Sequence, residues 1–262
     1  MFGKARRNLR RLLAAFKEKS PAVVALSGGV DSSVVANAAF LSSKKSIAVT
    51  VADPSVSRRE LESAVRIAEW IGIKHRVVQR KISPEVRRND YLRCYHCKSG
   101  VMDIAREVAD EEGIDTIADG SNFNDLKDSR AGMRACRERG VYSPLLELGF
   151  GKKEVKELAR EMGLPNYGKA AEACLSSRVM GRRIDERTLR RIEEAEEFVK
   201  KLTGASVVRV RDYGETARIE VDKQHIANLV KGKNPDRINK KFIKLGYRYV
   251  TADLGGYRVG GF

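Results

Sequence analysis

The chain has 262 residues, of which 42% are hydrophobic and 33% charged, a composition that fits a folded globular protein and excludes global disorder. Its formal net charge of +16 suits phosphate-rich partners such as nucleotides or RNA, although a surface rich in ion pairs is an equal alternative. The longest apolar run, at residues 21–26, is too short to span a bilayer, and no long apolar stretch follows the basic first residues. We therefore expect a cytoplasmic protein without a membrane partner.

Strands and helices alternate through the first two thirds of the chain. The apolar spacing predicts helices at residues 8–19, 30–41, 59–71, 98–112 and 152–161, and strands at residues 22–26, 46–52, 74–78 and 116–118. Strands that alternate with helices of ten or more residues indicate βαβ units and a parallel sheet. The sequence therefore predicts an α/β domain over residues 1–170.

The pattern changes in the last third. Residues 166–183 show no clear period, and we assign residues 171–183 to a linker loop. A charged helix at 185–201, strands at 207–210, 217–221 and 247–251, and a short helix at 224–230 predict a smaller α+β domain over residues 184–262. The basic stretch at 231–244 is interpreted as plain surface.

The strongest local signal is the loop Ser27-Gly28-Gly29-Val30-Asp31-Ser32-Ser33, which lies between a predicted strand and a predicted helix. Backbone N–H groups at a helix N-terminus bind anions, and glycines remove Cβ atoms that would obstruct them. The serine hydroxyls add donors, and Asp31 is suited to hold Mg²⁺ or to orient a nucleotide. The loop is no Walker A motif, because no lysine lies between Leu26 and Lys44. We therefore assign all seven residues to nucleotide binding.

Two later segments follow predicted strands and are candidates for the same site. Ligands of open parallel sheets bind beyond the carboxyl ends of the strands. We expect Thr50 to Asp53, after the second strand, to border the adenosine, and the segment Asp119 to Asn122 with Gly120, after the fourth, to face the same ligand. The alternative is that both are merely polar strand ends.

The cysteines are Cys94, Cys97, Cys136 and Cys174, and without a secretory signal they are not expected to form disulfides. Cys94 and Cys97 lie three apart ahead of a predicted helix, which suits half of a zinc site, half of an iron–sulfur site or a redox pair. Cys136, in a helical stretch, is interpreted as an ordinary buried thiol. Cys174 lies beside hydroxyls and Arg178, surroundings that suit a reactive thiol and can bind a phosphate.

In this order the motifs resemble the LarE family of ATP-dependent sulfur transferases, within the PP-loop ATP pyrophosphatase superfamily, over nearly the whole chain. The loop alone is shared by many PP-loop enzymes, whereas the ordered set is more specific. The resemblance rests on residues 27–33, 93–98, 119–122 with Asp125, Asp128 and Arg130, 141–145, 173–178, 209–211, 217–221 and 253–258.

The resemblance implies that ATP and Mg²⁺ adenylate a pyridinium carboxylate mononucleotide, releasing pyrophosphate, and that inserted sulfur then gives a thiocarboxylate for nickel-pincer nucleotide synthesis. In one branch of the family the cysteine that matches Cys174 gives up its own sulfur, so the resemblance implies that the linker at residues 171–183 is a sulfur-transfer loop. In another, three cysteines hold a [4Fe-4S] cluster with an exchangeable sulfide. Because this chain has Cys94 and Cys97 besides Cys174, we favour the cluster branch with these three ligands, and Cys174 and Asp31 as catalytic residues.

The C-terminal domain is expected to bind the substrate's ribose phosphate. Arg209 and Arg211 alternate on a predicted strand and therefore share one face. With Ser177 and Arg178 they form a candidate phosphate site, and a solvated basic strand is the alternative.

Other readings of the PP-loop stay open. A tRNA thiolation enzyme would suit the positive charge, but we find no zinc-finger cysteine sets and no recognisable RNA-binding domain. An amide-forming ligase of the NAD or GMP synthetase kind would not need the cysteine pair, and a nucleotide-binding regulator would show no turnover. For the favoured reading we expect a small-molecule nucleotide substrate, a sulfur donor and a homo-oligomer.

Overall fold

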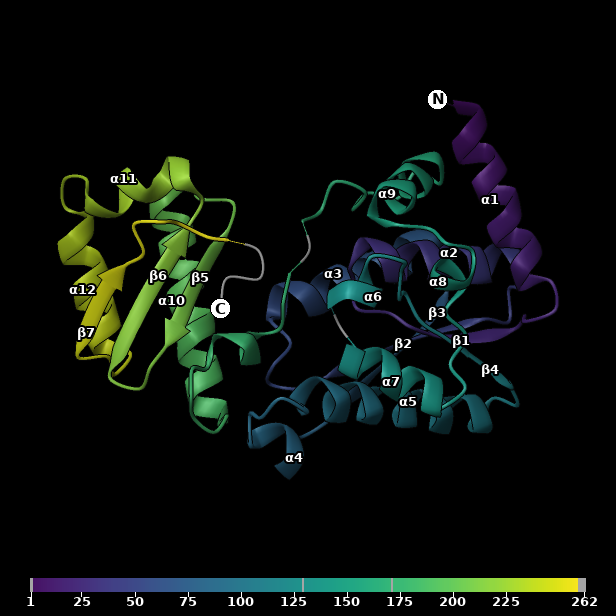
Figure 1. Ribbon diagram of the computed structural model, residues 1–262, viewed down its shortest axis with the longest axis horizontal. Coiled ribbons are helices and arrows are strands. Elements are labelled where there is room, and N and C mark those ends of the chain that lie inside the picture. The colour runs from purple at the N-terminus through teal and green to yellow at the C-terminus, as the bar shows by residue number, and fades with distance from the viewer. Residues whose placement is uncertain (1, 129, 171, 259–262) are drawn as a thin grey trace. The chain divides into compact units, whose positions relative to one another are not determined.

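The computed structural model describes residues 2–128, 130–170 and 172–258 (Figure 1). It divides into two compact units. The N-terminal unit comprises Met1–Val86 and Asp90–Glu172, and the C-terminal unit comprises Arg87–Asn89 and Ala173–Phe262. Among the described residues, no helix has the length and apolar character needed to cross a membrane.

The N-terminal unit is built on a parallel sheet. Its strands are β1 (Ala22–Ala25), β2 (Ile47–Ala52), β3 (Lys74–Gln79) and β4 (Thr116–Ala118), in the order β3-β2-β1-β4. All of β2 and most of β1 are buried, as their continuous apolar sequence requires for strands covered on both faces. The predicted parallel α/β fold is confirmed.

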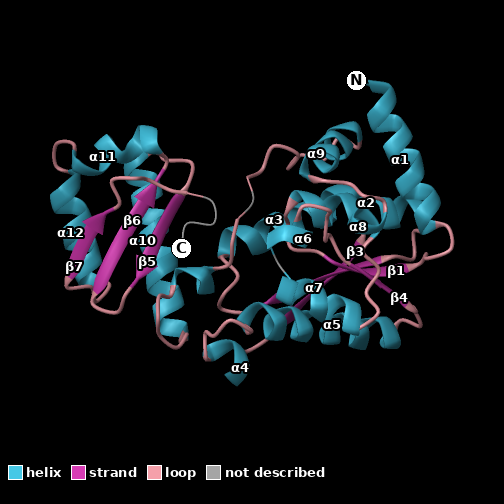
Figure 2. Ribbon diagram, viewed as in Figure 1, coloured by secondary structure: helices cyan, strands magenta, loops and turns pink. Residues whose placement is uncertain are grey.

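Helices cover both faces of this sheet (Figure 2). On one side of the sheet, α2 (Val30–Ser42) and α3 (Arg58–Ile71) pack against the strands. The helices α1 (Phe2–Phe16), α8 (Pro144–Glu147) and α9 (Lys152–Glu161) pack on α2 and share the same core. The other side of the sheet packs against α5 (Arg93–Glu111) and α7 (Arg130–Glu138). Two further single-turn helices are α4 (Pro84–Arg87) and α6 (Asp125–Asp128).

Helix α5 begins earlier than the sequence predicts. The apolar period suggests a start at residue 98, whereas the helix starts at Arg93. Its first turn has no buried residue before Ser99, so the apolar pattern could not reveal it. Cys94 and Cys97 therefore lie within the first turns of the helix and not ahead of it.

The C-terminal unit is an α+β fold, as predicted. Its sheet has the order β5 (Val208–Asp212), β6 (Thr216–Val221), β7 (Tyr249–Ala252), with β5 and β6 antiparallel and β6 and β7 parallel. The helical segments are η1 (Leu175–Arg178), α10 (Glu186–Thr203), η2 (Lys223–His225), α11 (Ile226–Val230) and α12 (Asn234–Lys244).

The basic stretch at 231–244 is not plain surface, which corrects the sequence-based interpretation. It contains α12, whose Ile238 and Phe242 are buried in the core of the C-terminal unit. These two residues lie four apart, a helical spacing that the surrounding lysines and arginines obscured.

The segment predicted as a linker, residues 171–183, is largely part of the C-terminal unit, while Ala171 lies outside the described residues. The Asn89 side-chain amide donates to the carbonyl oxygens of Val179 (3.0 Å) and Arg182 (2.8 Å), and the Ile184 N–H donates to the Arg87 carbonyl (2.9 Å). These partners lie about 90 residues apart in sequence, so local composition could not reveal them.

Candidate active site

The phosphate loop, residues 27–33, presents open backbone donors. Helix α2 begins at Val30 after Gly29, which provides no side-chain cap. Among the described residues, none accepts a hydrogen bond from the N–H groups of Val30, Asp31 or Ser32. The start of a helix with uncapped N–H groups and a positive dipole end is suited to bind an anion.

The serine hydroxyls of the loop brace its backbone. Ser32 Oγ donates to the Gly29 carbonyl (3.2 Å) and accepts from the Ser27 N–H (3.2 Å). Ser33 Oγ donates to the same Gly29 carbonyl (2.7 Å). These contacts preserve the turn between β1 and α2 on which the open N–H groups depend.

Two glycines are required by close backbone packing. Gly28 has φ +74°, and a Cβ atom there would lie 2.6 Å from the Ala64 nitrogen on α3. A Cβ atom on Gly120, after β4, would lie 2.6 Å from the Ser32 nitrogen. The end of β4 therefore packs directly against the start of α2, as a strand end that borders the phosphate loop should.

Asp31 is a half-buried carboxyl whose charge is only partly compensated. Its Oδ2 accepts a hydrogen bond from the Asn122 side-chain amide (3.1 Å). Burial and the nearby Asp125 raise the pKa of Asp31, opposed by Asn122 and by the cations Lys152 and Lys156. A carboxylate in this position would gain from a bound divalent cation.

The side chains predicted to border the adenosine have partners within the protein. Thr50 Oγ1 donates to the Leu26 carbonyl (2.6 Å) and lies 2.8 Å from His75 Nε2. Asp53 Oδ2 accepts from Arg80 Nη2 (2.6 Å). Both therefore stabilise the carboxyl ends of the strands, and their place beside a nucleotide stays a prediction.

Cys94 and Cys97 lie one helical turn apart at the start of α5. Cys94 is exposed and Cys97 half-buried. The guanidinium of Arg80, held by Asp53, lies 3.7 Å from Cys97 Sγ, and Gly100 leaves room for it because a Cβ atom there would collide with Arg80 Nη1. Within the described parts of the chain, no three His, Cys, Asp or Glu side chains converge as metal ligands would.

Cys136 is a buried thiol, as predicted. Its Sγ donates to Asp119 Oδ2 (3.4 Å), which also pairs with Lys98 Nζ (2.8 Å). Burial alone would raise the pKa of Asp119, but Lys98 and hydrogen bonds from Ser121 and Ser143 lower it to about 2. Burial raises the pKa of the Cys136 thiol to about 12, so it is protonated at neutral pH.

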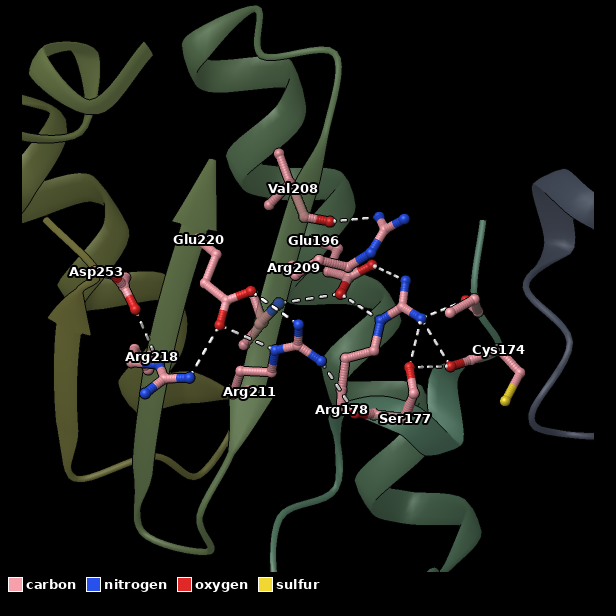
Figure 3. Close-up of polar contacts among 12 residues, drawn as sticks. Cys174, Ser177, Arg178, Glu196, Val208, Arg209, Arg211, Arg218, Glu220 and Asp253 are labelled. Atoms are coloured by element: carbon pink, nitrogen blue, oxygen red, sulfur yellow. Dashed lines mark hydrogen bonds and ion pairs between the residues drawn. The ribbon is translucent and has the colours of Figure 1, made fainter. Parts of the chain in front are cut away.

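The loop that carries Cys174 is tied to α10 through one arginine (Figure 3). Arg178 Nη1 donates to the carbonyl oxygens of Ala173 and Cys174 and to Ser177 Oγ (3.1 Å). Its Nε and Nη2 bind the Glu196 carboxylate at 2.9 and 3.3 Å. Only 3% of the Arg178 side chain is exposed, so this guanidinium holds the backbone around Cys174 in place.

The two strand arginines differ in their partners. Arg211 forms a bidentate pair with Glu220 (3.0 and 2.9 Å), and its Nη1 donates to the Ser177 carbonyl (3.1 Å). Arg209 Nη1 donates to the Val208 carbonyl (2.8 Å), and its guanidinium lies over the Tyr257 ring. Both arginines are buried, and Arg209 has no carboxylate partner among the described residues.

Sequence reasoning missed several polar partners of these groups. They are Arg80, Lys169, Glu196 and Glu220. Only Glu220 had a local signal, because it alternates with Arg218 on β6 and lies opposite Arg209 in the sheet. The other three come from segments far from their partners in sequence. Asn122, by contrast, lies in the segment that was expected to face the ligand, and it contacts Asp31 of the loop.

Comparison with known proteins gives one family match and relatives that align with nearly the whole chain. A family model described as asparagine synthase matches residues 6–88. A pyridinium-3,5-bisthiocarboxylic acid mononucleotide synthase of Lactiplantibacillus plantarum is 32% identical over 254 residues, which cover 95% of this chain and 91% of that protein. A Synechocystis protein described as uncharacterised is 39% identical over 256 residues, covering 96% of this chain and 95% of its own.

A partial match has a different description. A probable tRNA sulfurtransferase of Methanothermobacter thermautotrophicus is 29% identical over 157 residues, which cover 54% of this chain and 40% of that protein. The match to the mononucleotide synthase, by contrast, extends over nearly all of both chains.

Proposed function

The chain belongs to the LarE family and is an ATP-dependent sulfur transferase, and from this premise we propose that it converts a pyridinium carboxylate mononucleotide into a thiocarboxylate for a nickel-pincer nucleotide. The observation that carries the proposal is the phosphate loop with its three open N–H groups, in a chain that matches a mononucleotide synthase along 95% of its length. A cytoplasmic location belongs to the same proposal.

The first step is adenylation. A substrate carboxylate oxygen attacks the α-phosphorus of ATP, the bond to the bridging oxygen breaks, and pyrophosphate leaves with the electron pair. The N–H groups of Val30, Asp31 and Ser32 bind phosphate oxygens, and the Asp31 carboxylate binds Mg²⁺. Cations and fixed dipoles stabilise the charge that develops on the leaving group.

The substrate's own phosphate is assigned to Ser177, Arg178, Arg209 and Arg211. Among the described residues, the ion pairs of this cluster join three guanidinium groups to three carboxylates, and a fourth guanidinium, that of Arg209, has no carboxylate partner. The cluster consists of Arg178, Arg209, Arg211 and Arg218 with Glu196, Glu220 and Asp253. Arg209 is the best single candidate, because no described carboxylate neutralises it.

Sulfur transfer is assigned to a [4Fe-4S] cluster held by Cys94, Cys97 and Cys174, which when bound would supply an exchangeable sulfide at an iron without a protein ligand. The chain's residues fit such a group in two respects. Cys94 and Cys97 lie one turn apart at the start of α5, and Arg80 provides a cation at Cys97 Sγ. Cys136 is unsuited as a ligand, because it is buried and protonated.

Product analysis tests the first step. The purified chain, incubated with ATP, Mg²⁺ and the pyridinium carboxylate mononucleotide, is expected to release pyrophosphate as the acyl-adenylate forms. AMP follows when sulfur attacks the acyl carbon and breaks its bond to the AMP oxygen. Release of ADP and orthophosphate alone would contradict the proposal.

Four single Cys→Ala variants test the sulfur step after anaerobic reconstitution with iron and sulfide. Variants at Cys94, Cys97 and Cys174 are expected to lose iron and visible absorbance, whereas the variant at Cys136 retains both. If the wild-type chain binds no iron and Cys174 loses one sulfur mass after turnover, the cysteine itself is the sulfur donor.

The partial match to a probable tRNA sulfurtransferase supports a second candidate, thiolation of tRNA. The two functions separate in one assay in which the mononucleotide and tRNA are offered in turn. Pyrophosphate release that depends on tRNA and not on the mononucleotide would favour the second candidate.

A further inference from the structure

We propose that Lys169 supplies the cation that the phosphate loop lacks in its own sequence, and that its ammonium binds the β- and γ-phosphates of ATP and the pyrophosphate that leaves. The inference rests on the proposed function, in which ATP is cleaved between the α- and β-phosphates. No lysine occurs between Leu26 and Lys44. The fold brings one to the loop from a segment about 140 residues later.

The turn after α9 positions Lys169. Gly163, with φ +72°, ends the helix, and the fully buried Leu164 anchors the chain in the core. The backbone then turns, with the Lys169 N–H donating to the Asn166 carbonyl (2.9 Å). The side chains of Asn166 and Lys169, three residues apart, both reach the phosphate loop.

Both side chains meet at one carbonyl group. Lys169 Nζ lies 3.1 Å from the Gly28 oxygen and 3.2 Å from Ser63 Oγ. The Asn166 amide donates to the same Gly28 oxygen (3.3 Å) and to Ser33 Oγ (2.9 Å). An ammonium has three N–H donors, and these contacts use two of them. The third is available to a ligand of the loop.

The charge of Lys169 is not balanced by a neighbour. In the described part of the chain no carboxylate forms an ion pair with it, whereas Lys98, after the cysteine pair, is paired with Asp119 at 2.8 Å. An ammonium that is half-buried and without a counter-ion attracts a polyanion more strongly than an exposed one, since less water screens it.

This placement fits the needs of the reaction. When the bond between the α-phosphorus and the bridging oxygen breaks, the electron pair stays on pyrophosphate, and no proton has to move. The ammonium of Lys169 offsets the charge gained by this leaving group. In this proposal the N–H groups at the start of α2 and the Lys169 ammonium bind the same triphosphate, and they come from two different segments of the N-terminal unit.

A merely structural role for Lys169 would be to tether the Gly28 carbonyl, and the test must separate the two roles. Lys169→Met removes the charge and retains most of the stem. Asn166→Ala removes a second tether of the same carbonyl and retains the charge. Lys169→Arg restores a cation, and Lys153→Met, at an exposed position of α9, is the matched control.

Calorimetric titration of the full chain with inorganic pyrophosphate and Mg²⁺, and separately with AMP, gives the readout. We expect Lys169→Met to weaken pyrophosphate binding about 10- to 100-fold, the range of a charge-assisted hydrogen bond, and to leave AMP binding unchanged. Lys169→Arg is expected to retain most of the affinity, Asn166→Ala to have a small effect on both ligands, and Lys153→Met none.

Two results would overturn the inference. The first is that Lys169→Met binds pyrophosphate as tightly as the wild-type chain. The second is that Lys169→Met and Asn166→Ala each lose the binding of both pyrophosphate and AMP, as expected if both residues only hold the Gly28 carbonyl in place. The proposed function fails in a different way. If the wild-type chain released ADP instead of pyrophosphate during turnover, while Lys169→Met still weakened pyrophosphate binding, Lys169 would remain a phosphate ligand of another reaction.

Discussion

The phosphate loop of the N-terminal unit and the arginine cluster around Cys174 in the C-terminal unit are both assigned to phosphate groups, yet they are built in opposite ways. In the loop, the N–H groups of Val30, Asp31 and Ser32 at the start of α2 have no acceptor among the described residues. In the cluster, Arg178 and Arg211 are bound by Glu196 and Glu220.

The difference indicates how each region uses its donors. N–H groups without a protein acceptor at a helix start can bind an anion directly, so no hydrogen bond within the protein has to break when ATP binds to the loop. Buried guanidinium groups need carboxylate partners, because an isolated buried charge is strongly destabilising. In the cluster, Arg178 therefore holds the Cys174 backbone. Arg209, which has no carboxylate partner among the described residues, is the guanidinium that we propose for the substrate.

The largest expected effect comes from breaking the cluster at Arg178. Arg178→Ala leaves the largely buried Glu196 without its partner, and we expect the free energy of unfolding of the C-terminal unit to fall by about 3–5 kcal/mol. Urea denaturation measures this change. The control Arg190→Ala removes an exposed pair with Glu186 and should cost less than about 1 kcal/mol.

A double variant sharpens this result. Arg178→Met combined with Glu196→Gln removes both charges, so it should be more stable than Arg178→Ala alone. Equal stability of Arg178→Ala and the wild-type chain would show that the pair does not hold the loop.

Arg209 tests the other half of the comparison. We expect Arg209→Ala to raise the KM for the mononucleotide by an amount equivalent to about 1.5–3 kcal/mol, with the KM for ATP unchanged. Steady-state pyrophosphate release measures both constants. Arg248→Ala, at an exposed position of the same unit, is the control. A raised KM for ATP with an unchanged mononucleotide KM would reverse the assignment.

A substitution at Gly120 tests whether ATP binding depends on the backbone conformation of the phosphate loop. In Gly120→Ala the new Cβ must displace the Ser32 backbone, and overpacking of this kind costs about 1–3 kcal/mol. We expect lower stability and weaker ATP binding, measured by thermal unfolding and calorimetry. Gly113→Ala has positive φ but open space, so it should lose about 1 kcal/mol of stability and no ATP affinity. Equal ATP binding in both variants would contradict this view of the loop.

The sequence predicted the parallel sheet and the phosphate loop because both are local patterns. Continuous apolar runs indicate β1 and β2. Within residues 27–33, Gly28 is required because its backbone packs closely against α3. The sequence did not predict the start of α5, because the first turn of this helix has no buried residue. It also did not predict α12, because the two buried apolar residues of this helix lie among charged residues.

The partners of the candidate site could not be predicted, because they are set by tertiary packing. Glu196 reaches Arg178 from a helix 18 residues later, and Lys169 reaches Gly28 across 141 residues. The sequence does not show whether an arginine is paired with a carboxylate, so both strand arginines were equally good candidates for phosphate ligands. The structure separates Arg211, which is paired with Glu220, from Arg209, which has no such partner among the described residues.

The smallest expected effect concerns the charge of Asp31, and its sign is opposite for stability and for activity. Burial and the neighbouring Asp125 raise the pKa of Asp31, so ionisation of this carboxyl is harder in the folded chain than in the unfolded chain. As the pH rises past the ordinary pKa of an Asp, this carboxyl ionises in the unfolded chain before it does in the folded chain, and folding stability falls until the raised pKa is passed.

Asp31→Asn removes this loss, so the nucleotide-free variant should melt at a higher temperature than the wild-type chain at neutral pH and lose that advantage in acid. The same variant should release pyrophosphate more slowly, because it has lost a Mg²⁺ ligand. Melting curves between about pH 4 and pH 7, with and without Mg²⁺ and pyrophosphate, measure both signs. Asp115→Asn, at an exposed position, is the control. A variant that melts below the wild-type chain throughout would show that the Asn122 contact outweighs the cost of the buried charge.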